Sequence, residues 1–370
     1  MSIPDLLFYI FILIILIQIV FYGFIFMRFG LHKPELPKLK NIKISVLVCA
    51  KNEAENLKAF IPLILDQDYP EFELVLINDG SSDTSLDIMR EFERNNKNVK
   101  VVDVKPLDSF WNNKKYPLTL GIKASKYDFL LFTDADCIPV SSHWIREMSR
   151  HFTNQKTIVL GFGNYRKIKG NLLNKLIRYE TTVTAIQYFS FALMGSPYMG
   201  VGRNLAYRKD VFFNIGGFKD HMNVNSGDDD LFVNQVATPE NTTISYSHES
   251  STDSVPEKTF MSWFRQKRRH VSTASHYKTK HKITLGLLYI TQLLFWIIGL
   301  TLVIYVYKSA IVLALILFRF VLVALSYGLG ARKLKNLDTL ILLPFLELFL
   351  VLSQLVIFIT NLRSKNHSWR

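Results

Sequence analysis

Four long apolar segments and one long stretch of mixed composition between them dominate the hydropathy pattern of the chain. The segments are Leu6–Phe26, Ile283–Tyr307, Ala310–Leu329 and Leu340–Thr360. Each is close to the roughly 20 residues that a helix needs to cross a bilayer. The pattern therefore predicts an integral membrane protein with a soluble domain between its first and second membrane helices.

The same pattern predicts three regions along the chain. We expect an N-terminal transmembrane anchor in residues 1–30, a soluble domain in residues 40–272, and a membrane domain of about three helices in residues 283–362. The first segment lacks the basic start and the small-residue cleavage site of a signal peptide, which favours a retained anchor.

Basic residues flank these segments mainly on one side. Arg28 and Lys33 follow the first segment, Lys278 precedes the second, and Lys333 follows the third. The positive-inside bias predicts a cytoplasmic catalytic domain in a plasma or inner membrane. The basic tail, residues 363–370, would lie outside if all four segments cross. The alternative is that one C-terminal segment is re-entrant or interfacial.

Within the soluble domain, short apolar runs alternate with segments of helical periodicity. The runs are Ile44–Val48, Phe72–Ile77, Val99–Val104 and Tyr127–Phe132. Strands separated by helices of this length predict βαβ units and a mostly parallel sheet. The fold class is therefore α/β.

Acidic residues follow three of these strands. Glu53 follows the first strand, Asp79 the second, and Asp134 and Asp136 the fourth. Ligands of such sheets bind at the carboxyl ends of the strands, and two carboxylates one residue apart suit a hard cation. Each group alone also fits a helix cap or a solvated turn, but their convergence favours a binding site.

Charge and cysteine content narrow the function classes. The formal net charge is +13, and much of the excess flanks the apolar segments, which suits anionic lipid headgroups. No nucleic-acid motif accompanies it, so we do not expect a nucleic-acid partner. Cys49 and Cys137 have no ligand partner at short spacing and are expected to be buried strand-end residues.

Four stretches resemble, in order and spacing, the family 2 inverting glycosyltransferases with a GT-A fold. They read VCAKNEAENL, INDGSSDTS, KKYPLTLGIKASKYDFLLFTDADC and SGDDDLF, and the resemblance covers about residues 42–270. The membrane arrangement resembles that of poly-N-acetylglucosamine, hyaluronan and ceramide glucosyl synthases. The resemblance implies a Rossmann-like domain that binds a nucleotide-diphosphate sugar.

The resemblance also implies roles for residues of the donor site. Glu53 and Asp79 correspond to positions that hold the base and ribose of the nucleotide. Lys114 would contact the nucleotide or its phosphates, and Asp134 the nucleotide sugar. Asp136 would bind the divalent metal, Mg²⁺ or Mn²⁺, that bridges the diphosphate.

Two further motifs lie downstream. The Gly-Asp-Asp-Asp-Leu stretch implies Asp228 as the catalytic base, with Asp229 as the alternative register. Gln266 and Arg269 match a motif of the processive synthases and would also contact the donor. His270 replaces the tryptophan of that motif, which counts against a polymer-extending role.

These residues and segments are compatible with three functions of the protein. The favoured one is metal-dependent, inverting transfer of a sugar, expected from a uridine donor, to a lipid or lipid-linked glycan. The second is a processive polysaccharide synthase of the same fold. The third, from another class, is a transporter or non-catalytic scaffold, which would not need metal-binding and base carboxylates together.

Charged residues inside the apolar segments give a last set of expectations. Arg319 and Glu347 are costly in a bilayer and are expected to pair with each other, or else to line a path for an acceptor. Residues Leu172–Tyr198 are expected to form an amphipathic helix at the membrane interface.

Overall fold

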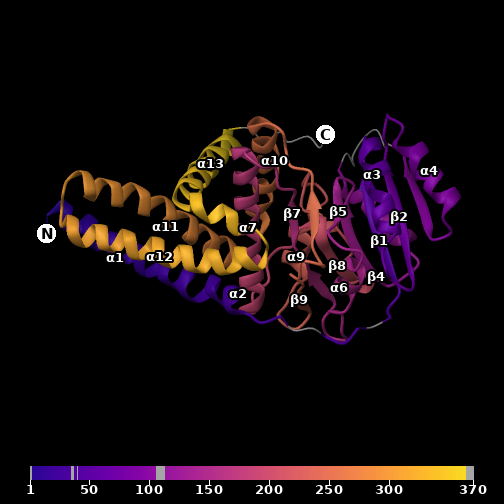
Figure 1. Cartoon of the computed structure of the whole chain (residues 1–370), viewed down its shortest axis with the longest axis horizontal. Coiled ribbons are helices and arrows are strands. Elements are labelled where there is room, and N and C mark those ends of the chain that lie inside the picture. The colour runs from indigo at the N-terminus through magenta and orange to yellow at the C-terminus, as the bar shows by residue number, and fades with distance from the viewer. Residues whose placement is uncertain (1, 35–36, 40, 106–112, 364–370) are drawn as a thin grey trace.

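Two lobes make up the computed structural model, which describes residues 2–34, 37–39, 41–105 and 113–363. Long helices form one lobe, with the N-terminus at its far end, and an α/β domain forms the other (Figure 1).

A seven-stranded mixed sheet forms the centre of the α/β domain. Its strand order is β3-β2-β1-β4-β8-β6-β9. The first four strands are parallel, as the sequence predicts, whereas β8 runs antiparallel to both of its neighbours. The strands are β1 (Ile44–Ala50), β2 (Phe72–Asp79), β3 (Val99–Val104), β4 (Phe129–Asp134), β6 (Ile158–Leu160), β8 (Leu205–Arg208) and β9 (Thr242–Ile244).

Helices cover both faces of this sheet because alternate strand residues point to opposite sides. Val46 and Val48 of β1 pack on the side of α3 (Ala54–Leu65), α4 (Ser85–Asn95) and α6 (Trp144–Ser149). Leu47 and Cys49 pack on the other side, with α5 (Lys115–Ala124) and α9 (Asp230–Val236). Both cysteines are buried, as expected.

A second, three-stranded sheet adjoins the end of β4. Its order is β5-β10-β7, where β10 pairs antiparallel with β5 and parallel with β7. The strands are β5 (Cys137–Pro139), β7 (Gly163–Tyr165) and β10 (Thr252–Ser254). This sheet brings residues far apart in sequence next to the acidic end of β4.

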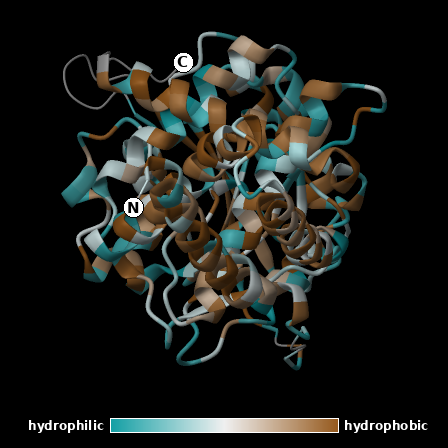
Figure 2. Ribbon diagram, turned by 90° about the vertical axis from the view of Figure 1, so that its left-hand side faces the viewer, coloured by the Kyte–Doolittle hydropathy of each residue, from teal (hydrophilic) through white to brown (hydrophobic). Residues whose placement is uncertain are grey.

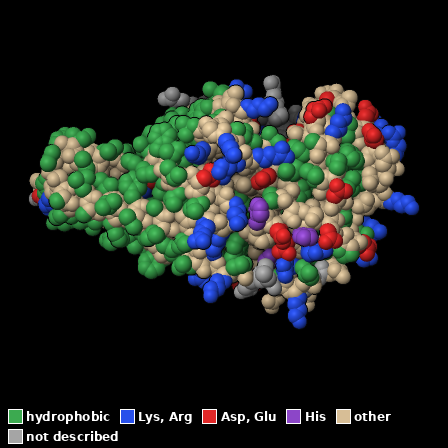
Figure 3. All heavy atoms as spheres, in the orientation of Figure 1, with side chains coloured by type: hydrophobic (Ala, Val, Ile, Leu, Met, Phe, Trp, Pro, Cys, Tyr) green, Lys and Arg blue, Asp and Glu red, His purple; other side chains and the backbone are tan. Residues whose placement is uncertain are grey.

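The helical lobe contains four helices that are long and apolar enough to cross a membrane. The first is a continuous helix made of α1 (Ile3–Ile19), a π-helical segment η1 (Val20–Phe26) and α2 (Met27–Leu31). The others are α11 (Thr279–Ile304), α12 (Ser309–Lys333) and α13 (Leu343–Arg363). Figure 2, which faces this lobe, shows brown, hydrophobic residues along these helices, and Figure 3 shows few charged side chains on the far end of the lobe.

Helix α13 differs from α1, α11 and α12 in that both ends of its segment lie near the α/β domain. The segment before it, η5 (Leu337–Leu342), begins where Asp338 accepts hydrogen bonds from Arg178 of α7 and lies 2.8 Å from the ammonium of Lys167 of the α/β domain. At the opposite end of α13, Asn361 accepts a hydrogen bond from Arg268, also of the α/β domain, at 3.0 Å. Both ends of the η5–α13 unit therefore contact the soluble domain. The tail beyond residue 363 lies outside the described residues.

Helix α7 (Leu172–Leu193) corresponds to the helix expected at the membrane interface, but it is not an exposed amphipathic helix. It lies between the α/β domain and the membrane helices, with contacts to α2, α12 and α13. Arg178 on this helix is buried against Asn336 and Asp338. The polar side chains of α7 therefore pack partly against protein, and its position at a membrane interface stays a prediction.

The predicted pair of membrane charges is confirmed. The guanidinium of Arg319 on α12 donates to both carboxylate oxygens of Glu347 on α13, and its Nε donates to Gln18 of α1 at 2.7 Å. Arg319 is 1% exposed and Glu347 is 3% exposed. The pair ties three membrane helices together in a region where unpaired charge is costly.

Candidate active site

The loops after β1 and β2 are joined to each other by hydrogen bonds. Asn52 accepts a bond from the backbone N–H of Ser82 at 2.8 Å, and the backbone N–H of Glu53 donates to Ser85 Oγ at 2.8 Å. Asn52 adopts a positive φ of 57°, which asparagine tolerates better than most residues. The two strand ends are thus held as one platform.

Glu53 and Asp79 lie on this platform, where the sequence placed the nucleotide-binding residues. Glu53 is half-buried at the start of α3 and accepts a hydrogen bond from Asn56 at 2.6 Å. Burial, together with the charges of Asp136 and Asp134, raises the pKa of Glu53. Asp79 is the last residue of β2. Glu53 is therefore in electrostatic reach of the carboxylates that end β4.

Lys114 connects the two sets of carboxylates predicted for the site. Its ammonium pairs with Asp134 at the end of β4, and lies 3.6 Å from an oxygen of Asp228. Burial alone would raise the pKa of Asp134, but the ion pair with Lys114 outweighs it and holds that pKa below its usual value. The structure thus brings the expected donor contact, Asp134, next to the expected base, Asp228.

The carboxylates of Asp134 and Asp136 fit a divalent cation. Together with Cys137 they offer ligand atoms within 4.8 Å of one another. Burial and the charge of Asp134 raise the pKa of Asp136, against the opposing charges of Arg203 and Lys114. Burial keeps the Cys137 thiol protonated, and its sulfur lies 2.9 Å from Ser254 Oγ. The hard oxygens of the two aspartates, and not the thiol, therefore suit Mg²⁺ or Mn²⁺.

The aspartate triplet separates into three environments at the start of α9. Asp229 accepts hydrogen bonds from the backbone N–H groups of Gly202 and Asp230, both at 2.7 Å. Asp230 accepts from Thr273 and from the Tyr277 hydroxyl, which lies at 2.6 Å. Asp228 faces Lys114 instead, so it is the member of the triplet placed with the donor-site residues.

These environments raise the pKa values of Asp229 and Asp230. Burial, with the neighbouring charges of Asp228 and Asp230, raises the pKa of Asp229 to about 7. Burial also raises the pKa of Asp230, against the effect of its hydrogen-bond donors. Asp229 and Asp230 have structural partners, which favours Asp228 as the reacting carboxylate.

Lys115 holds the loop that leads into the triplet, a role that no motif signalled. Its ammonium donates to the backbone carbonyls of His221, Val224 and Ser226, each at 2.7 Å. The side chain is 1% exposed, and burial lowers the pKa of Lys115 to about 8. The lysine therefore remains charged at neutral pH and fixes the backbone just before Asp228.

Helix α10 (Phe260–Thr273) brings Gln266 and Arg269 toward the same end of the sheet. Gln266 is 3.5 Å from the hydroxyl of Tyr165 on β7. The charge of Arg269 helps to lower the pKa of Asp134, which places the guanidinium within electrostatic reach of that carboxylate. The structure therefore gathers the predicted residues Asp134, Gln266 and Arg269 at one site, although they come from distant parts of the chain.

Arg203 is a further site residue that the sequence reasoning did not assign. Its guanidinium stacks 4.3 Å from the centre of the Tyr165 ring and donates to the Asn164 carbonyl at 3.1 Å. It is also among the positive charges that oppose the rise in the pKa of Asp136. The only signal in the sequence was an arginine within the glycine-rich stretch 200–207.

A small, partly open pocket lies beside the triplet. Lys114, Tyr207, Asp228 and Asp229 give it a polar side. Among the described residues, the buried Tyr207 hydroxyl has no hydrogen-bond partner. Space and an unsatisfied hydroxyl therefore lie next to Asp228.

Comparison with known proteins agrees with this geometry. The sequence profile described as glycosyl transferase family 2 matches residues 45–216, which contain every predicted donor residue up to Asp136. Asp228, Gln266 and Arg269 lie beyond the matched range, and the match tests the role of no single residue, so the roles of all the site residues stay predictions.

Two curated relatives and one solved structure are similar to parts of the chain. A poly-beta-1,6-N-acetyl-D-glucosamine synthase of Staphylococcus epidermidis is 29% identical over 204 residues, which are 53% of this chain and 47% of that protein. An uncharacterized glycosyltransferase of Haemophilus influenzae is 30% identical over 154 residues, 42% of this chain and 44% of that protein. The chain thus spans about half the length of these relatives.

The solved structure is a mannosyltransferase from Pyrobaculum calidifontis, in complex with GDP-Man and Mn²⁺. It aligns with a TM-score of 0.57 and 16% identity, over 88% of this chain and 98% of that one. At this identity the likeness concerns the fold. Taken with the family match and the strand-end geometry, it identifies residues 45–216 as a glycosyltransferase family 2 domain of the GT-A type, carried by a protein with candidate membrane helices.

Proposed function

We propose that the protein transfers a sugar from a nucleotide-diphosphate sugar, a uridine one, to a hydroxyl of a lipid or lipid-linked glycan, with inversion at the anomeric carbon. The observation that carries the proposal is the chain of contacts from Asp134 through Lys114 to Asp228. It sets a donor-side carboxylate, a phosphate-compatible cation and a candidate base side by side.

Each residue has a defined task in this reaction. Glu53 and Asp79 hold the nucleoside on the joined loops, while Lys114 and Arg269 supply positive charge for the diphosphate. When bound at Asp134 and Asp136, Mg²⁺ or Mn²⁺ would neutralise charge that develops on the leaving diphosphate.

The base acts on the other side of the sugar. Asp228 takes the proton of the acceptor hydroxyl as that oxygen attacks the anomeric carbon from the face opposite the leaving group. The bond to the diphosphate breaks in the same displacement, so no covalent intermediate on the protein is required. Lys115 keeps Asp228 in place, and Asp229 holds Gly202 beside it.

Placement against the membrane supports a membrane-borne acceptor. Lys278 donates to the Gln235 carbonyl of α9, Arg28 contacts Met194 beyond α7, and Lys333 donates to the Phe29 carbonyl of α2, whereas Lys308 lies 3.6 Å from Asp5 near the N-terminus. By the positive-inside bias, the catalytic domain is cytoplasmic. Because both ends of the η5–α13 unit contact that domain, we further propose that this unit enters the bilayer and returns on the same side.

A screen of nucleotide sugars for metal-dependent release of diphosphate tests the proposal. We expect one donor to be turned over in the presence of Mg²⁺ or Mn²⁺, with the rate lost on chelation. Asp136→Ala should lose this metal-dependent activity, whereas Asp87→Ala, which removes an exposed carboxylate of α4, should retain it. Turnover that depends on neither the metal nor Asp136 would contradict the proposed donor site.

A processive polysaccharide synthase is the second candidate, favoured by the similarity to the poly-beta-1,6-N-acetyl-D-glucosamine synthase of Staphylococcus epidermidis. His270, at the position where such enzymes carry tryptophan, argues against it. Separation of the products by length decides the matter, because single transfer yields one product size and processive synthesis yields long polymers.

A further inference from the structure

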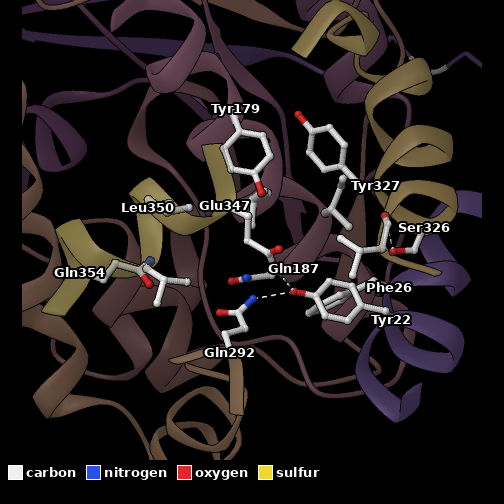
Figure 4. Close-up of a pocket in the computed structure, with 14 residues that line it drawn as sticks. Tyr22, Phe26, Tyr179, Gln187, Gln292, Ser326, Tyr327, Glu347, Leu350 and Gln354 are labelled. Carbon is white, nitrogen blue, oxygen red and sulfur yellow. Dashed lines mark hydrogen bonds between the residues drawn. The ribbon is translucent and has the colours of Figure 1, made fainter. Parts of the chain in front are cut away.

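A second pocket lies in the helical lobe, at a place unrelated to the donor site. It is a partly open pocket between η1, α7, α11, α12 and α13 (Figure 4). None of the residues assigned above to the donor or the base lines it. The side chains that line the pocket therefore determine what it can bind.

One side of the pocket is a closed network of polar groups. The Tyr22 hydroxyl of η1 accepts a hydrogen bond from Gln292 of α11 at 2.5 Å and donates to Glu347 of α13 at 3.4 Å. Glu347 in turn holds Arg319. Polar side chains from four segments of the helical lobe thus meet where membrane helices normally present apolar ones.

The other side carries polar groups whose hydrogen-bonding capacity is unused. Tyr179 of α7 is 3% exposed, and Figure 4 shows its hydroxyl directed toward Glu347 and the pocket. Among the described residues, neither this hydroxyl nor the side-chain amides of Gln187 and Gln354 have a hydrogen-bond partner. Tyr179 is buried and the two glutamines are half-buried, and because lipid offers no hydrogen bonds to such groups, their unused bonding capacity around one pocket favours an occupant that pairs them.

Charge limits what this occupant can be. The guanidinium of Arg319 lies 5.3 Å from the centre of the Tyr22 ring, and it is already engaged by Glu347 and Gln18. The pocket is lined by neither lysine, arginine nor histidine, and Glu347 adds a carboxylate. An anionic phosphate would meet no free cation here, whereas neutral hydroxyls can donate to and accept from tyrosine and glutamine.

The surroundings require that the occupant also has an apolar part. Phe26, Ile186 and Leu350 complete the lining of the pocket. Outside it, α12 and α13 expose large apolar side chains, among them Val321 and Val356. Figure 3 shows hydrophobic side chains covering much of the lobe that these helices form.

We propose that this pocket binds the neutral, hydroxyl-bearing headgroup of a membrane lipid, whose acyl chains lie along the apolar helices. Tyr179, Gln187 and Gln354 bond the hydroxyls of the headgroup. This binding goes beyond the proposed transfer reaction, and it does not require the bound lipid to be the acceptor.

Lipid retention by the full-length protein tests the proposal. The protein is purified in a polyoxyethylene detergent, which offers no sugar headgroup, and is mixed with monoglucosyl dioleoylglycerol or with dioleoyl-phosphatidylglycerol. Native mass spectrometry then counts the lipids that remain bound. We expect one glucosyl lipid to be retained in preference to the anionic lipid.

Variants of the lining locate the bound lipid. Tyr179→Phe combined with Gln187→Leu removes two unpaired polar groups while keeping the ring that packs 5.1 Å from Tyr327. Retention should fall about tenfold or more, because two neutral hydrogen bonds are lost. The matched control is Thr301→Val, since the Thr301 hydroxyl bonds to its own helix at 2.8 Å outside the pocket.

Three outcomes would overturn the proposal. They are retention of neither lipid, equal retention of both, and retention that the double variant leaves unchanged while its unfolding temperature stays at the parent's value. Release of diphosphate from the nucleotide sugar, measured on the same preparations, reports on the donor site separately. A failure of the lipid site is thereby distinguished from a failure of the proposed reaction.

Discussion

Replacing Lys115 with methionine tests how the residues before Asp228 are held. Methionine keeps the length and the apolar stem of lysine but removes the ammonium that binds three carbonyls in the loop from His221 to Ser226. The side chain is 1% exposed, so water does not readily replace the lost donors. The loop should therefore lose its fixed course.

The geometry sets the size of the effect. A hydrogen bond from a charged donor contributes about 1.5–3 kcal/mol, and three such bonds give an upper bound of about 5–9 kcal/mol. Asn113 still donates to the Met222 carbonyl at 2.8 Å, and freed carbonyls near the surface gain water, so we expect a net loss of about 3 kcal/mol. If the ordered conformation of the loop, which places Asp228, becomes less stable by that free energy, the turnover rate drops about 100-fold.

The assay compares turnover with donor affinity. Release of nucleoside diphosphate at saturating donor should fall, while the KM for the donor stays close to the parent value, because Glu53 and Asp79 lie on other loops. Limited proteolysis should cut the segment from residue 219 to residue 228 faster in the variant. Lys100→Met is the matched control, since Lys100 is exposed and donates to a single carbonyl, that of Ala124 at 2.7 Å. Parental turnover and parental proteolysis in Lys115→Met would refute the reasoning.

Two further predictions concern buried charge. The pKa of Asp229, raised to about 7 in the fold from a usual 3.8, means that the folded protein binds the proton more tightly, so the free energy of unfolding should fall as pH rises from about 4 to 7. Thermal unfolding of Asp229→Asn should show a flatter pH dependence over that window, and an unchanged slope would contradict the assignment. In the membrane lobe, Arg319→Leu leaves Glu347 buried without its partner and should destabilise the protein by about 3–5 kcal/mol, measured by unfolding in detergent. Adding Glu347→Leu should recover most of that loss, and a double variant as unstable as the single one would show that the charge pair is not the cause.

Much of the donor side was predictable from sequence because it depends on local signals. An apolar run that ends in a carboxylate, such as the one before Asp134, predicts both a buried strand and the edge at which its last residue lies. Parallel pairing of β1 with β2 and β4 then brings Glu53, Asp79 and Asp134 to one edge without further information.

Contacts made across the fold were not predictable in this way. The role of Lys115 depends on a loop more than 100 residues away, whose carbonyls carry no side-chain signal. Arg203 reaches the site because β7 and β10 bring Asn164 and Ser254 beside it. Helix α7 has the composition of an interfacial helix, but both lobes enclose it, and hydropathy alone does not distinguish lipid from protein as the neighbour.

The most direct test of the account compares Asp228→Asn with Asp229→Asn, using the donor found in the nucleotide-sugar screen. If Asp228 is the base, Asp228→Asn binds the donor as the parent does, by calorimetric titration, but loses sugar transfer, whereas Asp229→Asn retains a substantial part of it. Normal transfer by Asp228→Asn would contradict the assignment of the base, and with it the central claim about how this site works.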